Sequence, residues 1–113
     1  MSARVVARAA AVALSLAFAQ GAAAGGKAEA GKAKAAQVCA ACHGADGAKP
    51  SAPDQPILAG QYYDYLLKAM TDYKSGKRNN AIMKGFAAGL SVQDMEDLAA
   101  WFSTQKSSLH FQR

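Results

Sequence analysis

The sequence predicts a small all-α domain with three main helices and long loops. Alanine, the strongest helix former, supplies 28 of the 113 residues. After position 24, β-branched residues are too few to build several strands; they are Val38, Ile57, Thr71, Ile82, Val92 and Thr104. All three prolines and three of the glycines fall within residues 44–60, which predicts a long loop. A chain of this length holds one domain, and its composition argues against a β-sandwich, a β-barrel or a Rossmann unit.

Three segments carry helical patterns. Residues 29–41 are rich in alanine and contain no proline. In residues 61–75, apolar side chains recur every three or four positions and mark one face of a helix. The last helix is expected to begin after Ser91, a residue type that favours the N-cap position. Between the second and third helices we expect one turn around Ile82, and we expect residues 106–113 to fray.

Residues 1–24 are typical of a cleaved secretory signal peptide. Arg4 and Arg8 are followed by the uncharged run 9–19, and then by Ala22-Ala23-Ala24, a small-residue cleavage pattern. An uncleaved membrane anchor is the alternative, but alanine and glycine dominate the segment, and a span needs about 20 strongly apolar residues. We therefore expect an exported domain of residues 25–113 with no stable membrane insertion after cleavage.

The charge balance argues against a nucleic-acid partner. The net charge is +5, and removal of Arg4 and Arg8 leaves a mildly basic domain whose lysines and arginines form no long stripe. Export also separates such a domain from DNA and RNA. Because alanine buries little surface, the core of a domain this small is thin, and something large and apolar is expected to complete it.

The segment Cys39-Ala40-Ala41-Cys42-His43 has C-x-x-C-H spacing at the end of the first helix. Positions 39, 42 and 43 are three and four residues apart, so their side chains project from one helix face. Thiols on such a face can form thioethers with the vinyl groups of a haem, and the imidazole can reach the iron. The motif predicts one covalently attached haem c, with Cys39 and Cys42 forming the thioethers and His43 the proximal iron ligand.

A redox, structural or zinc-binding role for the C-x-x-C-H motif fits this sequence less well. A thioredoxin-like redox pair needs a βαβ context, which this sequence does not offer. A structural disulfide between Cys39 and Cys42 leaves His43 without a role. A zinc site from these three residues and His110 would place its fourth ligand in the tail, and adjacent cysteine and histidine ligands make poor tetrahedral geometry.

The sixth iron ligand must come from elsewhere in the chain. Met70 and Met95 lie on the apolar stripes of their helices, where core packing is the default role of methionine. Met83 lies between helices, near Gly85, where the backbone can approach a large ligand. The residues favour Met83, with His110 as the alternative.

Four stretches of the chain resemble small bacterial class I c-type cytochromes, of the single-domain c-553 type related to one half of the dihaem c4 cytochromes. The similarity covers roughly residues 31–102. The stretches are Cys39-Ala-Ala-Cys-His43-Gly44-Ala-Asp-Gly47, Pro56-Ile-Leu58-Ala-Gly60-Gln61, Arg78-Asn-Asn-Ala-Ile-Met83, and Leu90-Ser91 before Leu98-Ala-Ala-Trp-Phe102.

This resemblance carries implications for individual residues. It implies that Met83 is the distal iron ligand and that the carbonyl of Pro56 accepts a hydrogen bond from His43. It also implies that Gly31 allows the first and last helices to cross closely, with Trp101 across it. Finally, it implies a periplasmic protein that transfers electrons and is not an enzyme.

The surroundings of the haem are harder to assign from sequence. The expected pocket and core residues are Leu58, Tyr62, Tyr63, Leu66, Ile82, Phe86 and Leu98. Arg78 or a neighbouring asparagine could bind a haem propionate, with a solvated loop charge as the alternative. Basic residues near Met83 could steer an acidic redox partner, although a solvated surface is the simpler interpretation; they are Lys74, Lys77, Arg78 and Lys84.

The sequence thus favours a soluble exported monohaem cytochrome that carries single electrons between redox partner proteins. With histidine and methionine both bound, the iron would have no open position for a substrate. A haem c subunit of a larger periplasmic oxidoreductase would have the same fold and ligands. A gas- or peroxide-reactive haem protein would instead need an open sixth position.

Overall fold

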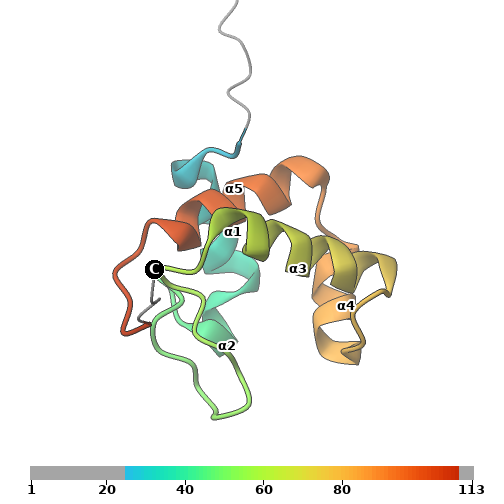
Figure 1. Ribbon diagram of the computed structural model, residues 1–113, viewed down its shortest axis with the longest axis horizontal. Helices are drawn as coiled ribbons and strands as arrows, with labels where there is room; N and C mark the ends of the chain where they lie inside the picture. Colours follow the sequence, from blue (N-terminus) through green and yellow to red (C-terminus); the bar gives the residue numbers. More distant parts are fainter. Residues whose placement is uncertain (1–24, 110–113) are drawn as a thin grey trace, which may run out of the picture.

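The computed structural model describes residues 25–109, and these form helices and loops without strands, as the sequence predicts. The helices are α1 (Ala28–Val38), α2 (Ala40–His43), α3 (Tyr63–Ser75), α4 (Ala81–Ala88) and α5 (Val92–Ser103). In the view of Figure 1, α2 and α4 both lie below α3, and the long loop after α2 extends further below. None of the described helices has the length and hydrophobicity to cross a membrane.

Two helices differ from their predicted form. The helix predicted over 29–41 is interrupted at Cys39, which has φ −116° and ψ −33°, so the motif occupies a break and the single turn α2. The segment around Ile82 is an eight-residue helix rather than one turn. Its first turn is capped by Asn80, whose side chain accepts a hydrogen bond from the backbone N–H of Met83.

Helix α1 packs directly against α5 at Gly31. A Cβ atom placed on Gly31 would lie 1.9 Å from the Asp97 carbonyl oxygen and 2.9 Å from Cβ of Trp101. No side chain larger than hydrogen fits in that space, so the close crossing requires glycine. This confirms the expectation for Gly31 and Trp101.

Hydrogen bonds fix the beginnings of both crossing helices. The buried carboxylate of Asp97 accepts from the backbone N–H of Lys27 at 2.7 Å, just before α1, and from Nε2 of Gln93 at 2.8 Å. At the start of α5, Ser91 and Asp94 form a capping box in which each side chain accepts from the other's backbone N–H. The backbone N–H of Ser91 is the main reason that the pKa of Asp94 lies below its usual value.

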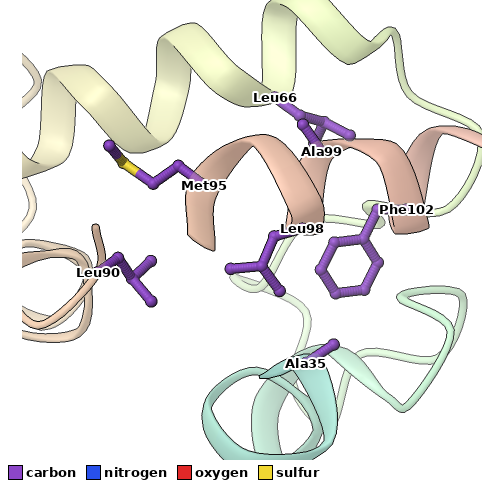
Figure 2. Packing of buried hydrophobic residues seen from close by; sticks show 7 residues of the cluster. All are labelled: Ala35, Leu66, Leu90, Met95, Leu98, Ala99 and Phe102. Atoms are coloured by element: carbon purple, nitrogen blue, oxygen red, sulfur yellow. The ribbon is translucent and has the colours of Figure 1, made fainter. Parts of the chain in front are cut away.

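The buried core is small and lies between α1, α3 and α5 (Figure 2). Figure 2 shows Leu66 of α3 beside Ala99 of α5, while Leu98 and Phe102 point toward Ala35 of α1. The buried apolar residues are Ala35, Ala59, Leu66, Ala87, Leu90, Met95, Leu98, Ala99 and Phe102. Four of these are alanines, which agrees with the expectation of a thin core.

The loop between α2 and α3 is held at both ends. Near its start, Gly47 has φ +75° and its carbonyl accepts from the backbone N–H groups of Leu58 and Ala59. Near its end, the N–H of Gly60 donates to the Phe102 carbonyl at 2.9 Å, which joins the loop to the end of α5. The predicted fraying does not begin at Lys106, because Ser107 lies against Gly60.

Candidate haem site

The C-x-x-C-H motif lies where α1 gives way to α2. The carbonyl of Cys39 accepts from the backbone N–H groups of Cys42 at 3.2 Å and of His43 at 3.0 Å, and this closes the turn that brings the three residues together. Both cysteines are half-buried free thiols, not a disulfide. The structure therefore offers two separate thiols beside one imidazole, as covalent attachment of a haem requires.

Burial, with a smaller contribution from Cys42, raises the pKa of the Cys39 thiol to about 11. This thiol is accordingly protonated at neutral pH.

His43 is buried, and its Nδ1 lies 2.9 Å from the carbonyl oxygen of Pro56. A carbonyl oxygen can only accept a hydrogen bond, so Nδ1 carries the proton and donates the hydrogen bond. This tautomer leaves the lone pair of Nε2 available for a metal ion, and the hydrogen bond fixes the orientation of the ring. The expected role of Pro56 as the acceptor is confirmed.

The turn before Pro56 is organised by Gln55, a residue that sequence reasoning does not single out. Its side-chain oxygen accepts from the backbone N–H of Ser51 at 3.1 Å, the hydroxyl of Ser51 at 2.8 Å and the N–H of Ala52 at 3.0 Å. The Ser51 N–H also donates to the Cys42 carbonyl at 2.9 Å. A glutamine in a loop has no sequence signature for this role.

Trp101 connects α5 to the residues that follow the motif. Its indole N–H donates to the Ala45 carbonyl at 3.1 Å, and the Lys32 ammonium lies over its ring. A groove of about 380 Å³ adjoins this contact. The groove is not the haem site, because neither the motif cysteines nor His43 nor Met83 lines it; its lining residues are Lys32, Ala36, Gly44, Ala45, Asp46, Lys49 and Trp101.

Met83 lies in the first turn of α4 and is half-buried. The structure therefore places it on a different element from the motif, and α4 is held against α3. Met95 is buried in the core and Met70 packs against it, which confirms their predicted packing role. His110 lies outside the described residues.

The expected pocket residues divide into two groups. Leu66 and Leu98 are buried in the core, and Leu58 and Tyr63 pack against it. The others expose large apolar surfaces, with exposed fractions of 54% for Tyr62, 70% for Ile82 and 47% for Phe86. Ile82 and Phe86 are four residues apart and share one face of α4. Such apolar surface beside Met83 suits contact with a large flat macrocycle.

Some of the basic residues near α4 are bound within the protein. Lys74 donates to the Leu90 carbonyl. The Arg78 guanidinium donates to the Tyr65 hydroxyl at 3.4 Å and lies over the ring of Tyr73. Arg78 is exposed and contacts two tyrosines, and Lys77 and Lys84 are exposed as well.

The zinc alternative finds no support in the part of the chain described by the structure. Residues 25–109 contain no group of three or more histidine, cysteine, aspartate or glutamate side chains arranged to hold a metal ion. The motif residues instead suit covalent attachment, with a buried imidazole whose tautomer is fixed.

Comparison with known proteins identifies the family. The sequence profile described as cytochrome c matches residues 28–106. The chain belongs to the cytochrome c family. This domain carries one haem c, attached through Cys39 and Cys42, and cytochromes c are electron-transfer proteins.

Individual relatives narrow the type of cytochrome c. Cytochrome c4 of Pseudomonas aeruginosa is 57% identical over 86 residues, which cover 76% of this chain and 42% of that protein. Cytochrome c-554(548) of Halomonas halodenitrificans is 44% identical over 71 residues, covering 60% of this chain and 84% of that one. The crystal structure of reduced cytochrome c4 from Pseudomonas stutzeri superposes with a TM-score of 0.67 at 47% identity, over 74% of this chain and 48% of that one.

The chain therefore spans less than half the length of the cytochromes c4 that it matches. It corresponds to one monohaem half of such a protein, and its length is closer to that of the c-554 relative.

Proposed function

We propose that this cytochrome c carries single electrons between redox partner proteins, with His43 and Met83 as the axial ligands of its iron. The observation that carries the proposal is the hydrogen bond of 2.9 Å from Nδ1 of the buried His43 to the Pro56 carbonyl. It leaves only Nε2 to bind a metal. The bound haem supplies reversible exchange of one electron between the ferric and ferrous states.

Met83 supports the proposal by its place in the fold. Met95 lies in the core and Met70 packs against it. Met83 instead lies in the first turn of α4, where the neighbouring apolar side chains are exposed. A thioether is a soft, neutral ligand, so it favours ferrous iron and raises the reduction potential. With both axial positions held by side chains, no position remains for substrate, which suits a carrier.

The test is the spectrum of ferric Met83→Ala holoprotein, with Met70→Leu as the matched control. We expect Met83→Ala to lose the methionine–iron charge-transfer band. Its reduction potential should fall by on the order of 0.1 V, well inside the range of ~0.8 V that axial ligands span. Met70→Leu should keep both properties. An unchanged band in Met83→Ala would show that another methionine binds the iron, whereas a holoprotein without this band before any substitution would make His110 the next residue to replace.

We also propose that the protein works in the periplasm after removal of residues 1–24, which lie outside the described residues. The support is the pattern of Arg4 and Arg8, an uncharged run and an alanine cleavage site. The mass of the protein purified from a periplasmic extract should equal that of residues 25–113 plus one haem. A mass that includes residues 1–24 would contradict cleavage.

A further inference from the structure

The connection between α3 and α4 is built from specific polar contacts. Helix α3 ends at Ser75 and is followed by Gly76, which adopts a left-handed conformation with φ +84°. The backbone N–H of Arg78 donates to the Asp72 carbonyl at 3.0 Å, and its guanidinium is held by Tyr65 and Tyr73. These contacts fix the chain to α3 as far as Arg78, three residues before α4 begins at Ala81.

Asn80 then begins α4 with two hydrogen bonds. Its backbone is extended, with φ −160° and ψ 112°, and its side-chain oxygen accepts from the backbone N–H of Met83 at 3.0 Å. Its carbonyl accepts from the N–H of Lys84 at 2.9 Å. The Asn80 side chain therefore bonds directly to the residue proposed as the distal ligand.

Within the polypeptide, packing of this first turn is limited to the half-buried Met83. Ala81 and Ile82 are exposed, and a Cβ atom added at Gly85 would find no neighbour within 4 Å. The buried residue of α4 is Ala87, near its other end. A helix of eight residues is too short to be stable by itself, so its sparsely packed first turn depends on the cap.

We propose that Asn80 is a positioning residue for Met83, and that its side-chain cap controls how often the methionine leaves the iron. The inference rests on the proposed axial role of Met83. Without the cap, the first turn of α4 frays and carries the Met83 side chain with it. The iron would then be reached more often by a competing ligand, although Asn80 itself touches neither the haem nor that ligand.

The experiment uses ferric holoprotein and measures the rate at which imidazole replaces the methionine, followed by loss of the charge-transfer band. Asn80→Ala should raise this rate roughly fivefold, the change expected when an N-cap residue is replaced by alanine. Asn80→Ser retains a neutral capping oxygen and should restore the original rate. Asn79→Ala is the matched control, because Asn79 is the exposed neighbour of Asn80.

The outcomes distinguish a positioning role for Asn80 from a purely structural one. If Asn80→Ala does not mature, Asn80→Gly replaces it, since glycine is tolerated at an N-cap and should give a smaller increase in rate. A lower unfolding midpoint in urea with an unchanged exchange rate would overturn the inference and leave Asn80 a structural residue only. Whether Met83 is the distal ligand at all is tested separately: an unchanged charge-transfer band in Met83→Ala would show that it is not.

Discussion

At the scale of single residues, the best-defined feature is the pairing of His43 with a carbonyl oxygen. Pro56 lacks an N–H, so the surrounding loop cannot use this residue as a donor, and its ring restricts the backbone. The acceptor is therefore held rigidly beside His43. Because the acceptor belongs to the backbone, the hydrogen bond does not depend on the identity of the side chain at position 56.

This leads to a prediction for Pro56→Ala. The substituted residue keeps the carbonyl that accepts from His43, so the spectrum of the holoprotein should be unchanged. The free energy of unfolding should fall by about 0.4–1 kcal/mol, because alanine gives the unfolded chain more freedom than proline. Urea denaturation checks the stability and visible absorption checks the ligands. A changed ligand spectrum would show that the proline ring itself holds the carbonyl in place.

The sequence predicts some site residues better than others. The spacing of Cys39, Cys42 and His43 is enough to predict haem attachment. The role of Pro56 as a hydrogen-bond acceptor is predicted only from the resemblance to class I cytochromes. Asn80 could have been found as an N-cap, since asparagine just before an apolar segment is a helix-start signal. Gln55 could not, because its three hydrogen bonds depend on a loop conformation that no local pattern encodes.

At the scale of elements, the crossing of α1 and α5 brings the haem-binding motif to the core. The same crossing ties α5 to the loop that follows the motif, through the indole of Trp101 and the Ala45 carbonyl. A disturbance at Gly31 should therefore reach both the stability of the fold and the haem site.

We expect Gly31→Ala to lower the free energy of unfolding by about 3 kcal/mol or more, because its Cβ would overlap the Asp97 carbonyl and overpacking is strongly destabilising. The matched control is Gly89→Ala, where the new Cβ would be 3.9 Å from its nearest neighbour. Its effect should stay within about 0.5 kcal/mol. Equal effects in urea denaturation would contradict the requirement for glycine at the crossing.

The elements also show where sequence patterns stop being informative. The periodicity of residues 61–75 and the capping residues of α5 predict those helices well, because the local signals agree with the fold. The end of α1 at Cys39 has no local signal, since neither Val38 before it nor Ala40 and Ala41 after it breaks a helix. The sequence predicts only one turn for α4, because Gly85 in its interior has a low helix propensity. Packing of α4 against α3 outweighs that low propensity.

At the scale of the whole molecule, the polypeptide buries a small core for a domain of this size. Of its described residues, Leu98 is the largest side chain that is fully buried, and the apolar face of α4 is left exposed by the protein alone. A domain of this size is marginal when its core is small. Haem contact with this apolar surface would provide the missing burial.

We therefore expect residues 25–113 with Cys39→Ala and Cys42→Ala, produced without haem, to lose most of the helical circular dichroism of the holoprotein. Thermal unfolding should also lose its cooperativity, because the remaining core is largely alanine. The holoprotein is the reference in both measurements. A cooperative transition near the holoprotein midpoint would show that the polypeptide core suffices.

The contact between Trp101 and Ala45 gives the protein an internal optical probe. This is the single tryptophan of the chain, and it is hydrogen-bonded two residues beyond His43. A porphyrin absorbs light where indole emits, so emission is extinguished while α5 is docked and returns when the α1–α5 crossing opens. The assembly and opening of this crossing can thus be timed in unlabelled protein by fluorescence alone.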